Sequence, residues 1–148
     1  MASNTPPCRL LVDPFPSNAA LNELWRVAWD DSAVGDFAPV LKRSLTHIGV
    51  YYGERLIGFV NVAWDGGRHA FLLDPCVHPG FRRQGIGTSL IREAVRCARD
   101  RGALWLHVDF EPHLERFYAD FGVRATKAGL IRLGAGEAQI SSGEGADL

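Results

Sequence analysis

The middle of the chain carries three apolar runs that are typical of β-strands. Residues 48–52, 55–64 and 68–77 are rich in β-branched and aromatic side chains, and short glycine-containing turns separate them. Runs of this kind, divided by only two or three turn residues, predict antiparallel strands joined by tight hairpins. The hydrophobic pattern therefore predicts an antiparallel sheet at the centre of the protein.

The residues before this sheet predict one strand and two helices. Residues 9–13 form a short apolar strand, which Pro14 and Pro16 end because proline cannot donate a hydrogen bond to a sheet. Apolar residues then recur at helical spacing behind Ser17, a plausible helix cap, and again over a shorter stretch at residues 37–45.

The residues after the hairpins predict a helix, a strand and a second helix. Residues 86–98 have an amphipathic helical pattern that ends near Gly102, and residues 103–110 read as a strand. A strand, a helix and a strand in succession imply a parallel pair with a right-handed crossover. A last helix is predicted after Pro112 and closes at Gly122, and the sequences VRAT and GLIRL that follow are expected to finish the sheet. The expected fold is therefore α/β (α+β), with a mixed, mostly antiparallel central sheet, flanking helices and a parallel pair between the fourth and fifth strands.

Length and composition place this fold in one ordinary globular domain. The chain has 148 residues, of which 47% are hydrophobic and 22% are charged. Residues 1–133 are expected to form the domain, and residues 134–148, rich in Gly, Ser, Ala and acidic side chains, a disordered tail. A formal net charge of -1 gives no reason to expect nucleic acid or an anionic membrane as a partner. Three widely spaced cysteines and the lack of a signal-peptide or membrane-spanning apolar run favour a cytoplasmic protein.

A glycine-rich loop precedes the helix predicted at residues 86–98. Residues 80–89 read GFRRQGIGTS, so Gly85 and Gly87 let backbone N–H groups approach a ligand where the helix begins. The helix N-terminus adds a partial positive charge, and Arg82 and Arg83 add donors that suit phosphate. The loop is therefore predicted to hold the phosphates of a nucleotide-type cofactor, with a plain strand-to-helix turn as the structural alternative.

Two common phosphate-binding motifs do not match this loop. Ile86 and Gly87 stand where a P-loop has its lysine and its Ser or Thr. Leu90 stands where a dinucleotide-binding fingerprint has its third glycine, and antiparallel hairpins precede the loop where that fold has a βαβ unit. Neither an NTPase nor a dehydrogenase is favoured.

The loop does match the pattern Arg/Gln-x-x-Gly-x-Gly/Ala, through Arg82, Gly85 and Gly87, and the sequence VHP precedes it. Together with the element order and the helix ending FYADFGV, this resembles the GNAT superfamily of N-acetyltransferases over residues 9–133. The resemblance implies that the loop binds the pyrophosphate of acetyl-CoA and that the strand before it binds the pantetheine arm. The cofactor residues that it implies are Cys76, Val77, Arg82, Arg83, Gln84, Gly85, Ile86, Gly87, Thr88 and Ser89.

Acyl transfer to an amine needs a base and an acid, and the resemblance implies Asp74 and Tyr118 for these roles. Asp74 lies in the strand before the loop, on an alternation that Leu72 and Cys76 share, and Pro75 after it predicts a bulge in strand pairing. The resemblance implies that Asp74 acts as a base through water or as an anchor for the amine, and the structural alternative is that it only caps that irregularity. Tyr118 would donate a proton to the leaving thiolate, although its helical spacing alone fits a core residue. The oxyanion would be held by a backbone N–H near Cys76, where a splayed strand leaves a donor unpaired.

Several polar residues in and after the strand at 103–110 are candidates for other roles. His107 is an alternative base, although a lone strand histidine is more often structural. Glu111 stands where many family members have an asparagine that contacts the cofactor, so this chain departs from the pattern there. His107, Asp109, Glu111 and His113 alternate like metal ligands, but Pro112 breaks the strand among them, and no metal site is assigned.

The sequence therefore predicts an acetyl-CoA-dependent N-acetyltransferase whose acceptor is the primary amine of a small molecule, acting through a ternary complex. A longer acyl group or a non-catalytic acyl-CoA sensor are the alternatives. Nucleic-acid binding through Arg82 and Arg83 is disfavoured because basic and aromatic residues are not interleaved. The identity of the acceptor, the choice between Asp74 and His107 as base, and the choice between a monomer and a homodimer stay open at this level.

Overall fold

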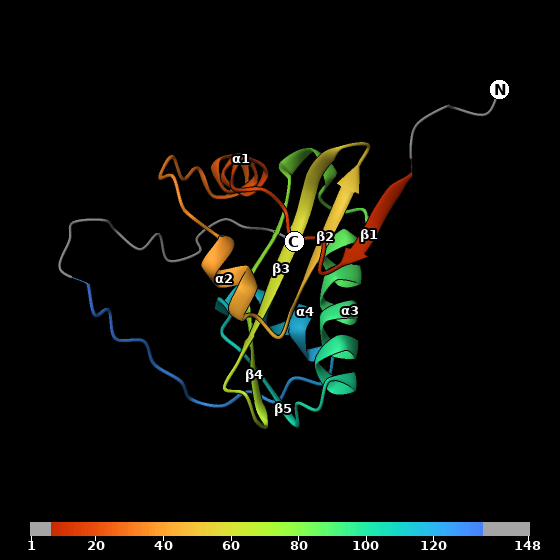
Figure 1. Ribbon diagram of the computed structural model, residues 1–148. Helices are drawn as coiled ribbons and strands as arrows, with labels where there is room; N and C mark the ends of the chain where they lie inside the picture. The colour runs from red at the N-terminus through yellow and green to blue at the C-terminus, as the bar shows by residue number, and fades with distance from the viewer. Residues whose placement is uncertain (1–6, 135–148) are drawn as a thin grey trace.

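The computed structural model describes residues 7–134 of the chain. The helices pack around one central sheet (Figure 1). The elements are β1 (Cys8–Val12), α1 (Asn18–Trp29), α2 (Ala38–Arg43), β2 (Thr46–Tyr52), β3 (Arg55–Trp64), β4 (His69–Val77), the 3-10 turn η1 (Pro79–Phe81), α3 (Ile86–Asp100), β5 (Trp105–Val108), the 3-10 turn η2 (Pro112–Leu114) and α4 (Glu115–Ala119).

The five strands form one sheet in the order β1-β2-β3-β4-β5. Neighbouring strands are antiparallel except β4 and β5, which are parallel and are connected through α3. The two-residue turn between β2 and β3 begins at Gly53, whose φ of 59° lies in the left-handed region that glycine adopts at low cost. The expected mixed sheet with a parallel fourth and fifth strand is confirmed.

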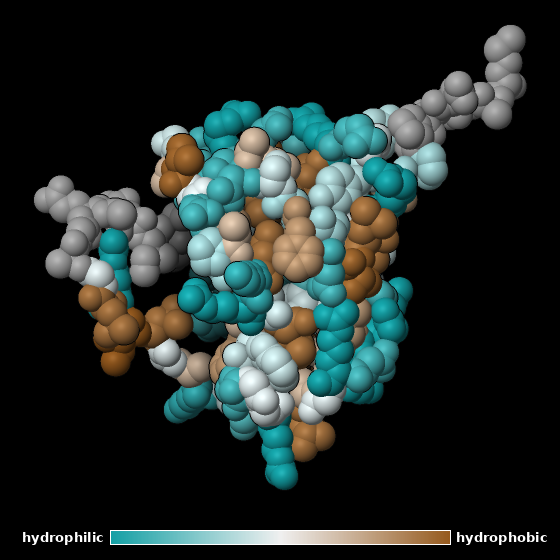
Figure 2. All heavy atoms as spheres, viewed as in Figure 1, coloured by the Kyte–Doolittle hydropathy of each residue, from teal (hydrophilic) through white to brown (hydrophobic). Residues whose placement is uncertain are grey.

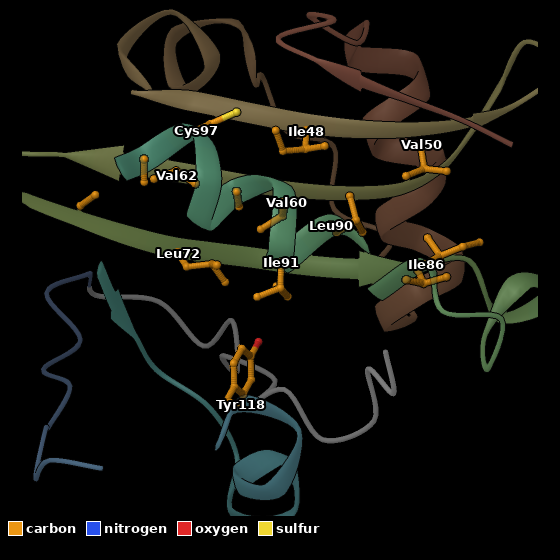
Figure 3. Packing of buried hydrophobic residues seen from close by; sticks show 14 of the residues in the cluster. Ile48, Val50, Val60, Val62, Leu72, Ile86, Leu90, Ile91, Cys97 and Tyr118 are labelled. Carbon is orange, nitrogen blue, oxygen red and sulfur yellow. The ribbon is translucent and has the colours of Figure 1, made fainter. Parts of the chain in front are cut away.

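Helices cover both faces of this sheet, because the strand side chains alternate between two apolar clusters. The larger cluster joins α3 to β2, β3, β4 and α4, and Figure 3 shows its members around Val60 and Ile91. The second cluster joins α1 and α2 to the opposite face through residues such as Leu21 and Phe59. The predicted Ser17 cap is also present, since its hydroxyl accepts from the Ala20 N–H at 3.1 Å.

Close packing of α3 on β3 positions the start of that helix. A Cβ added at Gly58 would lie 3.2 Å from Cγ2 of Ile86 and 3.3 Å from Cδ1 of Leu90. Glycine in β3 therefore lets the first two turns of α3 approach the sheet, directly beside the strand pair Gly58 and Val77. This contact places the N-terminus of α3 at the end of β4.

A β-bulge interrupts β4 where Pro75 predicted a break in strand pairing. Phe59 pairs with Cys76 but Asn61 pairs with Leu73, so β4 has one residue more than β3 between these pairs. Asp74 in the bulge has a φ of 54°. The extra residue reverses the side-chain alternation that follows it.

This reversal makes one expectation about Asp74 wrong. Leu72 packs in the α3 cluster, whereas Cys76 packs in the α1 cluster, so the two side chains lie on opposite faces of the sheet. The alternation predicted for Leu72, Asp74 and Cys76 together fails because a strand keeps its period of two only while no residue is inserted.

The end of the described chain also differs from expectation. Residues 123–134, which include VRAT and GLIRL, adopt no regular secondary structure. These two expected strands are wrong because a strand forms only against a partner edge, and this segment pairs with no strand of the described chain. Residues 135–148 of the predicted tail lie outside the described residues.

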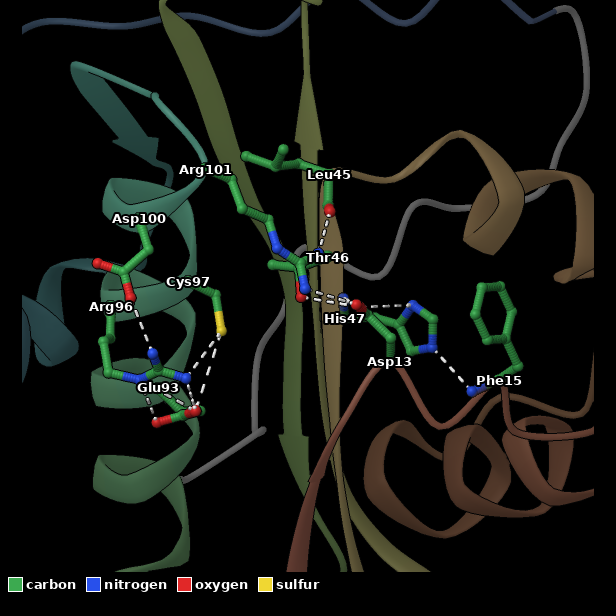
Figure 4. Close-up of polar contacts among 10 residues, drawn as sticks. All are labelled: Asp13, Phe15, Leu45, Thr46, His47, Glu93, Arg96, Cys97, Asp100 and Arg101. Carbon is green, nitrogen blue, oxygen red and sulfur yellow. Dashed lines mark hydrogen bonds and ion pairs between the residues drawn. The ribbon is translucent and has the colours of Figure 1, made fainter.

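A polar network ties β1 to β2 and to the end of α3 (Figure 4). One oxygen of Asp13 accepts from the hydroxyl of Thr46 at 2.8 Å and from the N–H of His47 at 3.0 Å, and the other accepts from Arg101 at 2.8 Å. The Nε2 atom of His47 accepts from the N–H of Phe15 at 2.9 Å, so the neutral ring carries its proton on Nδ1. Burial lowers the pKa of His47, although the Asp13 carboxylate opposes this effect.

This network predicts a loss of stability in mild acid. A histidine whose pKa is lowered by folding contributes stability that is present above its unfolded pKa, near 6.5, and is lost as the pH falls through the folded pKa. We expect the free energy of unfolding to fall by on the order of 1 kcal/mol between about pH 7.5 and about pH 5. Urea titrations of the wild type and of His47→Gln at both values measure it.

The glutamine variant should lose less stability over the same pH interval, because it has no ring to protonate. The pKa of His78 is also lowered by burial, but this residue is present in both proteins and its effect cancels. An equal loss in the two proteins would assign the acid sensitivity to other groups.

Candidate functional site

The end of β4 is paired on one side only. The ladder between β4 and β5 stops at Leu72 and Val108, whereas the ladder between β3 and β4 continues to Val77. Residues 73–77 therefore face no strand of the described chain along the β5 side. The expected splay is present, and it leaves backbone groups free to bind a ligand there.

The chain then makes a short ordered loop from β4 to α3. The Nδ1 atom of His78 accepts from the N–H of Gly80 at 3.0 Å, and the carbonyl of His78 accepts from the N–H of Phe81 at 2.9 Å. The ring of Phe81 packs 5.2 Å from that of Tyr52 on β2. These contacts hold the loop against the sheet before the helix begins.

Helix α3 starts at a left-handed glycine and has no side-chain cap. Gly85 is the N-cap with a φ of 81°, and its carbonyl accepts both from the N–H and from the hydroxyl of Ser89, each at 3.1 Å. The first N–H groups of a helix have no partner within it, and the helix dipole places positive charge there. The amides of Ile86, Gly87 and Thr88 are therefore placed where an anion could accept from them.

The two loop arginines have different surroundings. Arg82 donates from Nε to the carbonyl of Val77 and from Nη2 to the carbonyl of Ala28, both at 3.2 Å. It therefore ties the end of β4 and the end of α1 to the loop, a contact that the sequence pattern did not predict. Arg83 is exposed and, within residues 7–134, has no hydrogen-bond or ion-pair partner. Its guanidinium, like the exposed Gln84 side chain, is free to meet an anion.

Asp74 combines an exposed position with an altered acidity. The residue is exposed at the bulge. Protein atoms around its carboxyl group nevertheless displace water from the carboxylate, which raises the pKa of Asp74 above the ordinary value. The Cys76 thiol is buried, and burial together with the Asp74 charge raises its pKa well above the usual range. Cys76 therefore stays a protonated packing residue, and its backbone is paired with Phe59 of β3.

Tyr118 lies inside the α3 cluster, which also contains Val77 and Ile86. Its ring stacks on Phe110 at 4.9 Å and meets Phe117 edge-on at 5.1 Å. Figure 3 shows the ring extending from α4 with its hydroxyl toward the sheet. Burial raises the pKa of Tyr118 to about 12, because the phenolate would be poorly hydrated there. The hydroxyl is consequently a proton donor at neutral pH.

A pair of histidines joins β4 to β5 away from the bulge. The Nδ1 atom of His69 lies 2.8 Å from Nε2 of His107, and the ring of Phe71 stacks on His107 at 4.7 Å. The sequence pattern indicates His107 but not His69, because only the parallel register that pairs Phe71 with His107 brings the two rings together. His107 thus has an orienting partner.

Residues 7–134 contain neither a metal-binding cluster nor a membrane-spanning helix. No group of three or more His, Cys, Asp or Glu side chains in this range is arranged to hold a metal ion, and His107, Asp109, Glu111 and His113 form no such group. No helix in the same range has the length and apolar character needed to cross a membrane.

The structure thus gathers most of the predicted donor-site residues at one place. Cys76 and Val77 end β4, Arg82 joins that end to the loop, and Gly85 to Ser89 begin α3. Tyr118 reaches the same cluster as Val77 from the far end of the chain. His107 pairs with the first half of β4, before the bulge at Asp74.

Comparison with known proteins agrees with this geometry. Residues 8–123 match the family described as the Acetyltransferase (GNAT) family. The mycothiol acetyltransferase of Nocardia farcinica (strain IFM 10152) is 28% identical over 117 residues, which cover 73% of this chain and 37% of that protein. The chain spans 30% to 57% of the lengths of the curated relatives that it matches.

Solved structures share the fold at low sequence identity. A probable acetyltransferase from meticillin-resistant Staphylococcus aureus superposes with a TM-score of 0.72 and 17% identity, over 87% of this chain and 100% of that one. An aminoglycoside N-acetyltransferase in complex with CoA superposes with a TM-score of 0.64 and 17% identity, over 89% of this chain and 97% of that one. The family match covers every helix and strand described above, and the chain belongs to the GNAT acetyltransferase family.

Proposed function

We propose that this protein transfers the acetyl group of acetyl-CoA to a primary amine of a small molecule, by direct attack within a ternary complex. One observation carries the proposal: the uncapped N-terminus of α3 adjoins the half-paired end of β4, and Arg82 ties the two together. An anion-binding helix terminus beside unpaired strand amides suits a ligand with a pyrophosphate and an amide-containing arm.

The donor site is built chiefly from backbone. The N–H groups that begin α3 bind the pyrophosphate, and Arg83, Gln84 and Thr88 surround it with further donors. The hydroxyl of Ser89 joins them by turning away from the Gly85 carbonyl. A Cβ at Gly85 would meet no protein atom within 4 Å, so the space above this residue is open to a ligand. The backbone of Cys76 and Val77 binds the pantetheine arm along the unpaired side of β4.

Asp74 is the proposed base. An alkylammonium group has an unperturbed pKa near 10.4, so it must lose a proton before its nitrogen can attack. The Asp74 carboxylate takes this proton through water, and its bulged position aims it out of the strand ladder. Its raised pKa brings the carboxyl nearer to neutral pH than an ordinary aspartate, which makes it a better proton acceptor.

Tyr118 is the proposed acid. The amine nitrogen forms a bond to the acetyl carbon, the carbon–sulfur bond breaks, and the phenol gives its proton to the departing sulfur. A free backbone N–H near Cys76 stabilises the charge that develops on the carbonyl oxygen. As the amide forms, the nitrogen loses its second proton, which passes through water to the Tyr118 phenolate. Asp74 releases the first proton to solvent, so both groups return to their starting states.

Helices α1 and α2, which we propose line the acceptor site, favour a small organic amine. Helices α1 and α2 contain only 12 and 6 residues, and Trp25 of α1 packs 5.0 Å from Phe37 and 5.6 Å from Phe59. Phe59 pairs with Cys76 next to the bulge, so this aromatic cluster borders the proposed site. Aromatic faces attract ammonium groups. Two of the proteins named above are called after small molecules, mycothiol and aminoglycosides.

The test is an acceptor screen with the full-length protein and acetyl-CoA. We expect amine-dependent acetylation of at least one class among aminoglycosides, polyamines, amino acids and peptide N-termini, detected as acetylated product by mass spectrometry. Mass spectrometry is preferred to a thiol reagent for released CoA, because such a reagent would also react with Cys8, which is an exposed free thiol. Binding of acetyl-CoA without transfer to any amine would contradict the proposal and favour a sensor. Turnover only with a longer acyl-CoA would show that the acyl donor is that compound and not acetyl-CoA.

Two matched variants then decide which side chain is the base. Asp74→Asn should lower kcat about 100-fold and His107→Gln should leave it within about threefold, since removal of a general base costs on this order. In the wild type, kcat should fall as the pH decreases through the raised pKa of Asp74, because only the carboxylate accepts a proton. The opposite ranking of the two variants would transfer the role to the pair His69 and His107.

A further inference from the structure

Asn61 is a buried polar residue in the middle of β3 and is 2% exposed. Its neighbours Val60 and Val62 pack in the α3 cluster, so its side chain lies on the opposite face of the sheet, where α1 and α2 pack. Its Oδ1 atom accepts from the hydroxyl of Ser44, at the end of α2, at 2.5 Å. This separation suits an O–H···O bond and is too short for an N–H···O bond, so the amide oxygen faces Ser44.

The NH2 group of Asn61 has no hydrogen-bond partner within residues 7–134. Asn18 and Asn22, the other asparagines in this range, each donate through the NH2 group and accept through the oxygen. Every side-chain nitrogen or oxygen of the described chain that is shut off from solvent has a partner. The Asn61 nitrogen therefore lies where water or a ligand can reach it. A buried amide with two free donor hydrogens is suited to bind an oxygen atom of a ligand.

This amide lies beside the bulge that carries Asp74. Asn61 pairs with Leu73 and Phe59 pairs with Cys76, so the bulge lies between these two pairs. Phe59 is 2% exposed in the α1 cluster, whereas Leu73 is 40% exposed. Figure 2 shows hydrophobic residues, in brown, at the surface beside α2, so the two helices do not cover this side of the molecule completely. Asn61 is thus placed where the covered part of this face meets the open part, next to the proposed base.

We propose that the NH2 group of Asn61 binds an oxygen atom of the acceptor, so that the preferred acceptors carry a hydroxyl or carbonyl oxygen close to the amine. The inference rests on the proposed acetyl transfer and narrows its acceptor class. Adjacent strands lie about 4.8 Å apart, so an oxygen bound at Asn61 is roughly one strand spacing from Leu73, the neighbour of Asp74 in the chain. Amino sugars, amino alcohols and α-amino carbonyl compounds place an oxygen and an amine this close together. A polyamine in its cationic form has donors only and would leave the Asn61 NH2 group unpaired.

The first test is the binding of amines to the full-length protein saturated with CoA, measured by calorimetric titration. Two pairs of amines differ in whether they carry oxygen: glucosamine against cyclohexylamine, and leucinamide against isoamylamine. At least one oxygen-bearing amine should bind at least about tenfold more tightly than its counterpart, because the counterpart leaves a buried donor unpaired. The two pairs separate hydroxyl from carbonyl recognition. Equal affinities within both pairs, tightest binding by spermidine, or no binding of either oxygen-bearing amine would each overturn the proposal.

Variants at position 61 show whether the preference depends on this side chain. Asn61→Leu has a similar shape but no donor, so it should lose the preference and still bind the alkylamines. Asn61→Asp replaces the donor with a carboxylate oxygen and should shift the preference toward spermidine, because a carboxylate attracts cations. Leu104→Asp adds the same charge at an exposed residue outside the site and should keep the wild-type preference. A preference that survives in either variant at position 61 would overturn the assignment to Asn61.

A spectroscopic test observes the amide directly in the wild type. The NH2 signals of Asn61 in a nitrogen–proton correlation NMR spectrum are identified by their absence from Asn61→Asp. They should shift when the preferred oxygen-bearing amine is added and stay in place with its alkyl counterpart; unchanged signals with the oxygen-bearing amine bound would overturn the proposal. Binding to the CoA-loaded protein requires no transfer, so selective binding without acetylation of any amine would contradict the proposed function and support the role of Asn61. Acetylation of amines without this selectivity would support the proposed function and overturn the role of Asn61.

Discussion

Replacing Tyr118 with phenylalanine should lower kcat for acetyl transfer by about 100-fold and leave the affinity for acetyl-CoA nearly unchanged. The variant removes only the hydroxyl, which is the proposed proton donor to the departing sulfur. It keeps the ring that stacks on Phe110 at 4.9 Å and packs within the α3 cluster. Among residues 7–134 the hydroxyl makes no hydrogen bond whose loss would destabilise the fold. Steady-state kinetics with the best acceptor from the screen, together with thermal unfolding, measure both effects.

The pH dependence of this step has a definite sign. The pKa of Tyr118 is raised to about 12 by burial, so the hydroxyl keeps its proton throughout the neutral range. Loss of the acid form would lower kcat only at strongly alkaline pH. Any decrease of kcat toward low pH must therefore come from another group, such as Asp74.

A matched control uses the same chemical change elsewhere. Tyr51→Phe also removes a phenol hydroxyl from a partly buried ring, but that ring lies on β2 in the α1 cluster. It should keep kcat within about twofold of the wild type. Full activity of Tyr118→Phe would leave Tyr118 as a core residue only, and an equal loss in both variants would point to a general effect on the fold.

The sequence predicted those features of the fold that depend only on residues close together in the chain. Ser17 caps α1, Gly53 turns the first hairpin, and Pro75 coincides with the bulge, because each residue type acts on its own backbone. The loop before α3 was predicted for the same reason. Its glycine at 85 takes up the left-handed conformation from which the helix starts.

Features that depend on distant partners were not predictable in this way. The contact of His69 with His107 follows from the register of two parallel strands, which no local pattern determines. The bond from Arg82 to the carbonyl of Ala28 depends on where α1 ends relative to the loop. The failure of GLIRL to form a strand has the same origin, since strand propensity does not determine whether a segment pairs with a strand edge.

The candidate site shows both kinds of feature together. The sequence identified Asp74, but the inserted bulge residue placed Leu72 and Cys76 on opposite faces, against the expected alternation. The residue type of a site can thus be read from the chain, while the direction in which its side chain points depends on pairing with the neighbouring strand.

Replacing Gly85 with glutamate should abolish the binding of acetyl-CoA. The residue has a φ of 81° at the start of α3, and no protein atom lies within 4 Å of an added Cβ, so the new side chain enters the proposed ligand space. Its carboxylate would occupy the anion-binding helix terminus and repel the pyrophosphate. In the wild type, acetyl-CoA at about 100 times its Kd should stabilise the fold by about 2.7 kcal/mol, seen as a rise in Tm. In Gly85→Glu this rise should vanish, with affinity reduced at least about 100-fold.

Gly66→Glu provides a closely matched control for backbone strain. Gly66 has the same φ of 81°, and an added Cβ there also has open space, but the residue lies in the turn between β3 and β4. Both variants should lose about 1–2 kcal/mol of stability, because a residue with a Cβ is strained in the left-handed region. Only Gly85→Glu should lose the response to acetyl-CoA, measured by thermal shift and by calorimetric titration. A rise in Tm that persists in Gly85→Glu would exclude the loop as the pyrophosphate site. If the rise is lost in Gly85→Glu but kept in Gly66→Glu, backbone strain cannot be the cause, because both variants share it.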